Sequence, residues 1–345
     1  MKVNTLQLKR ALSAALFVLL LSVAGTKNAL AQNQVATLQH NDTITGVFYG
    51  QNAFVSAHNA AIDGDVITLS SGTFQSCEIN KSITIHGAGY IYDSITQVTP
   101  TIISGTFYIK ASNISFEGIK FTGEIYCGYN GPNMNNNSFN KCIINVINNW
   151  TNYHNNVMSD FQFVNCIINS FNFQHFIGTS IVNSVVKIDE YIRSDMYNLN
   201  TFNNSIVLFE NGKPIQDLIA YNSIIATVSG HEISNCTFFN CIGIETGETL
   251  LFEGQTAQNV MEVDSYEDVF ETFDGTISYD NIYQLKNDIA SSFLGHDGTE
   301  VGIYGGITPY KTRPPYMILK NCNVAGQTDE NKKLNVEMEL IGPED

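Results

Sequence analysis

The chain has 345 residues and a formal net charge of −16, although only 14% of its residues are charged. A protein this acidic repels nucleic acid, anionic lipid and polyanionic sugars at long range, so these classes are excluded as expected partners. Its polar residues are mostly amides and hydroxyls rather than ions, which is typical of an extracellular β protein.

The first 31 residues predict a secretory signal peptide. The basic opening M-K-V-N-T-L-Q-L-K-R precedes the apolar run A-L-S-A-A-L-F-V-L-L-L-S-V-A-G, and Ala29-Leu30-Ala31 supplies a cleavage site. The apolar run is short for a membrane span, which takes ~20 residues. We therefore expect no membrane span and export to the periplasm, the cell surface or the extracellular space. Cleavage before Gln32 removes four basic residues and no acidic one, which leaves a net charge of −20.

The next residues predict a capped stack of strands. Residues 47–61 have the pattern of a short amphipathic helix, which would cover the open end of a solenoid. Residues 63–74, 79–89, 101–109 and 113–123 alternate β-branched and polar residues between glycine turns, as strands do.

A short phrase then recurs about every twenty residues: an amide, a small residue and two apolar residues. Aligned on the small residue, the copies are Cys142, Cys166, Ser184, Ser205, Ser223 and Cys241, at steps of 24, 18, 21, 18 and 18 residues. Such a unit is too short for a helical hairpin but fits one coil of a parallel β-helix, with coils ~4.8 Å apart. The variable step disfavours a left-handed β-helix, and the scarcity of leucine disfavours a leucine-rich repeat. We therefore predict an all-β, single-stranded, right-handed parallel β-helix.

The amides of the phrase predict a structural ladder at one corner of the coil. Stacked amides can hydrogen-bond to one another or to the turn backbone and so satisfy polar groups that a bend leaves unpaired. The predicted ladder is Asn165, Asn183, Asn204, Asn222 and Asn240.

The C-terminal part loses the phrase. Residues 261–280 are acidic and aromatic and predict irregular closing coils, and residues 316–340 predict two closing strands. Since no Pro/Gly linker divides the chain, we expect one domain over 32–345, with coils over about 60–322.

Seven cysteines leave at least one thiol unpaired, and none forms a C-x-x-C pair. Because three of them replace serine within the phrase, we interpret them as small buried side chains rather than disulfides or metal ligands.

The segments 63–74 and 79–89 resemble the opening coils of the pectin-lyase-like β-helix superfamily. Residues 288–306, D-I-A-S-S-F-L-G-H-D-G-T-E-V-G-I-Y-G-G, are similar to the closing segment of secreted β-helix proteins from Bacteroidetes. This resemblance covers most of residues 47–322 and implies the fold. It also implies two enzyme activities to test for, polysaccharide lyase and glycoside hydrolase.

The residues for these reactions are sparse. A lyase needs convergent cationic groups, often with Ca²⁺, to neutralise a uronate and remove its proton. Strand alternation places Lys187, Asp189 and Arg193 on one face, which makes them candidate catalytic residues or, alternatively, an exposed ion-paired strand. The aspartate motifs of polygalacturonases are missing, and no cofactor is predicted, since no acidic cluster supports calcium.

Two asparagine-rich loops, residues 127–137 and 148–156, predict a binding site. The second loop holds the single tryptophan and lies in the longest repeat. Aromatic rings surrounded by amides suit a neutral sugar, and loops on a rigid scaffold commonly carry function. The candidate ligand-binding residues are Tyr129, Trp150, Asn152, Tyr153, His154 and Asn155.

The sequence therefore favours a secreted, non-catalytic β-helix protein that binds a neutral glycan or cell-surface polysaccharide. A polysaccharide lyase or glycoside hydrolase, and a structural rod or adhesin without a sugar ligand, stay open as alternatives.

Overall fold

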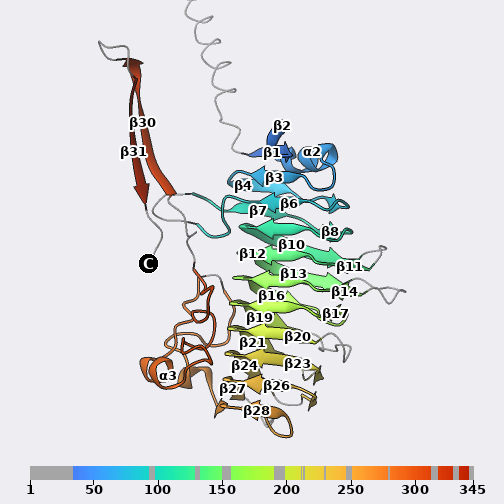
Figure 1. Ribbon diagram of the computed structural model, residues 1–345, viewed down its shortest axis with the longest axis vertical. Coiled ribbons are helices and arrows are strands. Elements are labelled where there is room, and N and C mark those ends of the chain that lie inside the picture. Colours follow the sequence, from blue (N-terminus) through green and yellow to red (C-terminus); the bar gives the residue numbers. More distant parts are fainter. Residues whose placement is uncertain are drawn as a thin grey trace, which may run out of the picture.

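The protein is a parallel β-helix of about nine turns in its computed structural model (Figure 1). The structure describes residues 34–92, 98–128, 133–149, 157–189, 199–210, 212, 214–228, 231–245, 251–278, 280–311, 318–328 and 334–341. The prediction of an all-β parallel solenoid with an N-terminal helix is confirmed.

Two long sheets run the length of the stack, and each coil contributes one strand to each. We call them sheet A and sheet B. The parallel strands of sheet A are β3 (Val66–Leu69), β6 (Thr84–His86), β9 (Ser115–Glu117), β12 (Ser138–Asn140), β15 (Gln162–Val164), β18 (Ser180–Val182), β20 (Asn200–Asn203), β23 (Leu218–Tyr221), β26 (Thr237–Phe239) and β28 (Thr256–Gln258). The strands along sheet B are β4 (Gly72–Gln75), β7 (Thr101–Ser104), β10 (Ile119–Cys127), β13 (Ile143–Asn149), β16 (Ile167–Phe171), β19 (Val185–Ile188), β21 (Ile206–Phe209), β24 (Ile224–Thr227), β27 (Ile242–Glu245) and β29 (Met261–Val263).

Short strands form a further side of some coils. Strands β5 (Glu78–Ile79) and β8 (Phe107–Ile109) pair with each other, and β8 also pairs with β10, so both belong to sheet B off its main path. One small parallel sheet contains β11 (Met134–Asn135), β14 (Met158–Ser159) and β17 (Phe176–Ile177), and another contains β22 (Ile215–Gln216) and β25 (Ile233–Ser234).

The N-terminal end is capped by a hairpin and a helix. Strand β1 (Val35–His40) pairs antiparallel with both β2 (Thr43–Tyr49) and β3, and helix α2 (Ala53–Ala60) buries Phe54 and Ala57 against the first coil. The helix predicted over 47–61 is thus confirmed for its second half. Residues 47–49 belong to β2 instead, because V-F-Y continues the pairing with β1.

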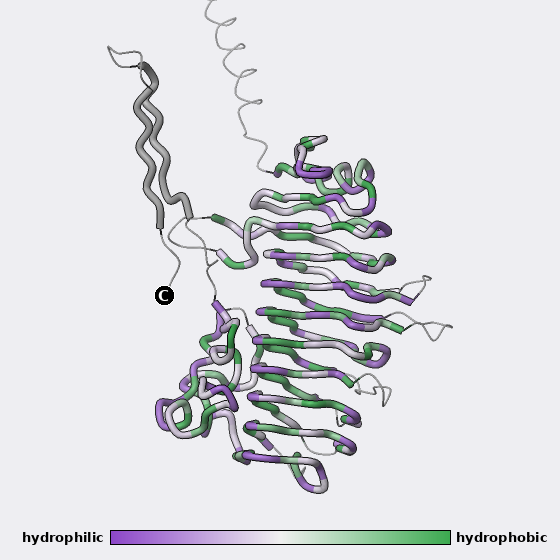
Figure 2. Tube along the Cα trace, viewed as in Figure 1, coloured by the Kyte–Doolittle hydropathy of each residue, from purple (hydrophilic) through white to green (hydrophobic). Residues whose placement is uncertain are grey.

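Stacked apolar side chains fill the inside of the coil. Phe116, Phe139 and Phe163 occupy equivalent positions in sheet A, and their rings stack with centroids 4.9 and 5.1 Å apart. Figure 2 shows the alternation of hydrophobic and hydrophilic residues along the coils that directs these side chains inward. Ring stacking at the strand spacing gives the core the density of a protein interior.

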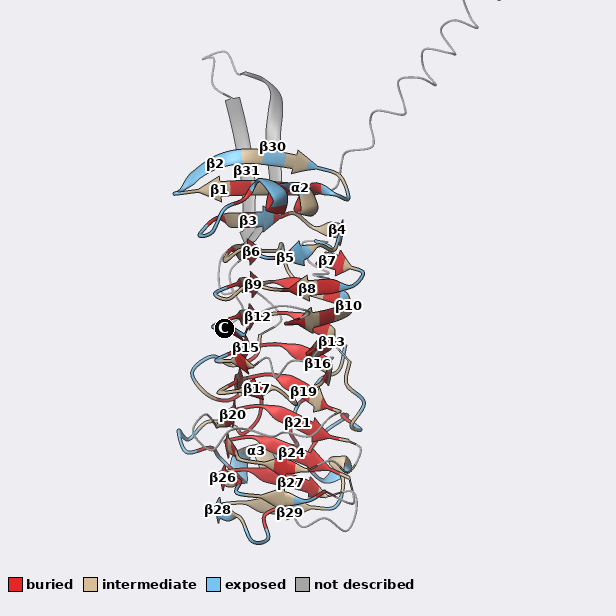
Figure 3. Cartoon of the chain, turned by 90° about the vertical axis from the view of Figure 1, so that its right-hand side faces the viewer, coloured by how far each residue is buried: buried red, intermediate tan, exposed pale blue. Residues whose placement is uncertain are grey.

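From β13 to β27, sheet B carries buried side chains on both faces. Its outer side chains, including Ile167, Val185, Ile206 and Ile224, form a second hydrophobic cluster with residues from beyond position 264. Figure 3 shows buried residues along β16, β19, β21 and β24. This explains the paired apolar residues of the repeat, because one side chain faces the core and the next faces outward.

The cover of sheet B is residues 264–311, which we call the strap. The last coil strand ends at Val263, and the strap that follows is irregular apart from η2 (Tyr266–Asp268) and α3 (Asn287–Ser292). It lies beside the coils (Figure 1, orange) and runs back along the stack. The carbonyl of Leu294 accepts a hydrogen bond from Asn240 in a late coil, and the carbonyl of Lys311 accepts one from Tyr90 near the N-terminal end. The irregular C-terminal segment therefore seals a sheet face rather than adding coils.

The two predicted C-terminal strands are present as β30 (Ile318–Thr328) and β31 (Leu334–Ile341). They pair antiparallel with each other and form a two-stranded sheet of their own.

Candidate glycan-binding surface

The predicted sugar-binding residues lie outside the described residues: Tyr129, Trp150, Asn152, Tyr153, His154 and Asn155. The strands that lead into both loops are described. Strand β10 ends at Cys127 and β13 at Asn149, on adjacent coils whose last residues are in parallel register. Both loops therefore leave the scaffold from neighbouring positions.

A stacked tyrosine pair lies where these strands end. Tyr108 of β8 and Tyr126 of β10 are in register, and their ring centroids are 5.6 Å apart with planes 21° from parallel. Both side chains are partly exposed on the outside of the coil. Tyr126 precedes loop residue Tyr129 by three positions, and its neighbour in β13, Asn148, precedes Trp150 by two. We call Tyr108 and Tyr126 the tyrosine platform.

Polar groups surround the platform. The Tyr126 hydroxyl donates a hydrogen bond to the Glu124 carboxylate, and this bond is the main cause that raises the pKa of Tyr126 to about 12. On the other side, Glu78 is in register with Tyr108 and forms an ion pair with Lys110 at 2.8 Å.

This arrangement suits a neutral sugar. In a stacked pair each ring covers one face of the other, so the second face of Tyr126 is directed along the column toward the smaller Asn148. A sugar ring can place its C–H face against such an aromatic ring while its hydroxyls bond to nearby amide and carboxylate oxygens. The carboxylate of Glu124 opposes a uronate at the same place, whereas that of Glu78 is paired with Lys110.

The tyrosine platform was not predicted from the sequence, although a signal for it exists. Tyr108 in F-Y-I and Tyr126 in I-Y-C hold the same place in their strands and are 18 residues apart, which is one of the steps of the repeat.

The candidate catalytic residues form an ion-paired cluster. Lys187 Nζ lies 2.6 Å from Glu210 Oε2 and 3.7 Å from Asp189 Oδ1, and Arg193 lies outside the described residues. The hydrogen bond to Glu210 is the main cause that raises the pKa of Lys187. A lysine that acts as a general base needs a lowered pKa, so this environment opposes the catalytic interpretation.

The five asparagines of the predicted ladder all occupy the corner between sheets A and B. Their φ angles lie between 46° and 53°, in the left-handed region that asparagine tolerates better than most residues. The amides of Asn204 and Asn222 are 3.5 Å apart. Three of the amides also bond to the strap: Asn183 donates to the carbonyls of Ile303 and Gly305, Asn240 donates to Leu294, and Asn222 accepts the backbone N–H of His296.

The small residue after each asparagine forms a second, internal ladder. Ser184 Oγ donates to the carbonyl of Val182 at 2.8 Å and accepts the backbone N–H of Cys166, one coil away, at 2.9 Å. The thiol of Cys166 likewise donates to Val164. Serine and cysteine can replace each other here because both are small and both donate.

The prediction of unpaired thiols is confirmed. Six of the seven cysteines are free, and five of these six are buried: Cys127, Cys142, Cys166, Cys236 and Cys241. Burial raises the pKa of Cys241 to about 12 and that of Cys236 to about 11, so these thiols stay protonated and unreactive at neutral pH.

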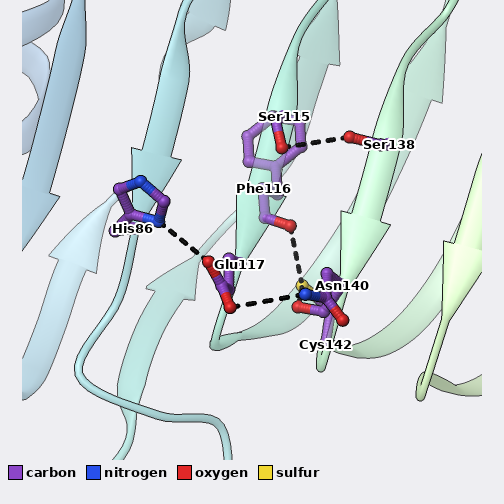
Figure 4. Close-up of polar contacts among 7 residues, drawn as sticks. All are labelled: His86, Ser115, Phe116, Glu117, Ser138, Asn140 and Cys142. Carbon is purple, nitrogen blue, oxygen red and sulfur yellow. Dashed lines mark hydrogen bonds and ion pairs between the residues drawn. The ribbon is translucent and has the colours of Figure 1, made fainter. Parts of the chain in front are cut away.

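The outer face of sheet A carries a polar network in its N-terminal half (Figure 4). His86 Nδ1 lies 3.1 Å from Glu117 Oε2, Asn140 Nδ2 donates to Glu117 Oε1 at 3.3 Å, and Ser138 donates to Ser115 at 3.0 Å. These residues hold matching places in β6, β9 and β12, so the network crosses the strands along the axis of the stack.

Within the described ranges, no group of three or more His, Cys, Asp or Glu side chains is arranged to hold a metal ion. Among the helices of the described chain, none has the length and hydropathy needed to cross a bilayer. Comparison with known proteins found no match for this chain among protein-family models, curated proteins or solved structures.

Proposed function

We propose that this chain is an exported, non-catalytic β-helix protein that binds a neutral glycan at the tyrosine platform and the two loops beside it. The observation that carries the proposal is the stacked pair of Tyr108 and Tyr126. Strand β10, which holds Tyr126, continues in sequence into the loop of Tyr129, and its neighbour β13 continues into the loop of Trp150. An aromatic surface on rigid strands and the starting points of two amide-rich loops are thus neighbours.

Charge supports a neutral ligand. The chain carries 33 acidic and 17 basic residues, and the carboxylate of Glu124 lies beside the platform. A uronate polymer would meet repulsion both at long range and at the surface itself. A lyase activity at Lys187 gains no support, because that lysine is held by two carboxylates and its pKa is raised.

The test is retention of the mature chain, residues 32–345, on immobilised neutral and acidic polysaccharides. We expect retention on a neutral polysaccharide and no new chain ends in the supernatant. Trp150→Ala and Tyr126→Ala should each weaken retention at least tenfold, since one stacking contact contributes about 1.4 kcal/mol or more.

A matched control is Tyr49→Ala, which removes a 60% exposed tyrosine from the N-terminal cap, away from both loops. It should bind as the wild type does. Unchanged binding of both platform variants would remove the site assignment. Cleavage of a uronate polymer would favour the lyase alternative, and absence of retention on every polysaccharide would leave the structural rod.

A further inference from the structure

Among the described strands β15 to β28, the outer face of sheet A has no charged side chain. From β15 to β28 the strands are in parallel register, and their outward residues form two columns along the stack. The columns contain Gln162, Ser180, Thr201, Ile219, Thr237 and Thr256, and Val164, Val182, Asn203, Tyr221, Phe239 and Gln258. We call these twelve residues the neutral strip. On so acidic a chain, this stretch of surface offers a ligand no charged partner, which suits an uncharged ligand.

An aromatic pair lies in the middle of the strip. The rings of Tyr221 and Phe239 are stacked with centroids 5.3 Å apart and planes 12° from parallel, and Tyr221 is 37% exposed. Exposed amides follow on both sides of the pair in the same column, Asn203 before it and Gln258 after it. The strip thus repeats the chemistry of the tyrosine platform, aromatic rings next to amides, on another sheet.

The strip is rigid and separate from the described packing interfaces. Its side chains belong to neither hydrophobic cluster of the described chain, and the strap lies along sheet B instead. Its backbone is held in a parallel ladder on both sides of each inner strand. Because this backbone is already ordered, binding a ligand to it loses little protein conformational entropy.

We propose that the neutral strip is a second glycan-binding surface, which takes one extended neutral polysaccharide chain along the axis of the stack. This inference rests on the proposed function for the class of ligand. From Val182 to Gln258 the strip crosses five strands, about 19 Å at ~4.8 Å per strand, so it contacts several consecutive sugars of a polymer.

Two binding surfaces on different sheets make the protein bivalent. The platform lies beside sheet B at β8 and β10, whereas the aromatic pair lies on sheet A at β23 and β26. A polymer bound at one surface can be joined to another polymer bound at the second, so the protein cross-links chains.

The test is light scattering of the monomeric mature chain mixed with soluble neutral polysaccharides, with xylan, galactomannan and mixed-linkage β-glucan as probes. The wild type should raise the scattering of the polymer that it binds. Tyr221→Ala/Phe239→Ala should still bind this polymer, through the platform, but should lose the rise in scattering. Tyr126→Ala should also lose the rise in scattering, because it binds the polymer only through the neutral strip. Tyr49→Ala should keep the rise in scattering.

A second variant guards against misfolding of the double alanine variant. Thr237→Arg leaves both rings in place and puts a long charged side chain into the strip, so it should also bind without cross-linking. Wild-type scattering from both strip variants would overturn this inference and leave the proposed function intact. Absence of binding by the wild type would overturn both.

Discussion

Asn183 donates its side-chain amide to the carbonyl of Gly305 at 2.7 Å, across 122 positions of sequence. The same amide donates to Ile303, and its oxygen accepts the hydroxyl of Thr308 at 3.0 Å. A residue that the repeat requires for a left-handed corner thus also fastens the strap. The asparagine ladder thus both forms the corner and holds the cover of sheet B in place.

The first prediction concerns this attachment. Asn183→Ala should lower the free energy of unfolding by about 2–3 kcal/mol more than Asn165→Ala, because it leaves buried strap carbonyls unpaired. Both asparagines have left-handed φ angles, 46° and 53°, so the backbone penalty of alanine cancels in the comparison. Urea unfolding of the two variants measures the difference, and equal losses would show that the strap bonds contribute nothing.

The second prediction concerns close approach of the strap. A Cβ atom on Gly305 would lie 1.7 Å from the carbonyl oxygen of Glu300 and 2.8 Å from Nδ2 of Asn204. Gly305→Ala should therefore loosen the strap, expose the outer isoleucines of sheet B and increase the binding of a hydrophobic dye. Gly298→Ala is the control, since that glycine has a left-handed φ of 75° but open space around it. Equal dye binding by the two variants would contradict the packing described for Gly305.

The third prediction concerns acid. Burial lowers the pKa of His58 in the N-terminal cap from 6.5 to about 4. As the pH falls, His58 is therefore protonated in the unfolded chain before it is protonated in the folded chain. The stability that this group contributes is complete above pH 6.5 and falls as the pH drops toward 4. Hydrogen exchange of the cap should accelerate over this range. His58→Gln should remove that part of the pH dependence, and an unchanged profile would exclude His58 as its source.

The fourth prediction concerns the internal ladder. Cys166→Ser should cost less than about 1 kcal/mol, because serine already donates from the equivalent place at Ser184. Cys166→Val, which keeps the volume but removes the donor, should cost more. In the native protein the buried thiols should react with a thiol reagent only after denaturant is added. Rapid reaction of most thiols without denaturant would contradict their burial.

The sequence predicted the coils well because their determinants are local. Each corner needs a residue that tolerates positive φ, a small donor and an apolar pair, and these recur at the step of one coil. In the structure the apolar pairs at Ile167–Ile168 and Ile224–Ile225 fill both faces of their strands, which was not predicted from the repeat.

The strap could not be predicted, because its contacts carry no periodic signal. Asn240 meets Leu294 and Asn183 meets Thr308 at separations of 54 and 125 residues. Side-chain amides bind backbone carbonyls there, and a carbonyl is the same in every residue. From the sequence, the ladder asparagines were therefore predicted to act only at the corner, and their bonds to the strap were missed.

For the proposed binding site, the sequence predicted the two loops but not the tyrosine platform on the strands beside them. Trp150 and Tyr129 stand out by composition, whereas Tyr108 and Tyr126 gain meaning only when register places them side by side. The neutral strip was missed for the same reason, since Tyr221 and Phe239 become neighbours only through the stacking of β23 on β26.

Binding of a neutral glycan without catalysis is tested most directly by retention of residues 32–345 on a panel of neutral and acidic polysaccharides, followed by a reducing-end assay of the supernatant. Retention on a neutral polysaccharide without new chain ends is the predicted result. Release of new chain ends, or retention on uronate polymers alone, would contradict a neutral-glycan-binding, non-catalytic protein.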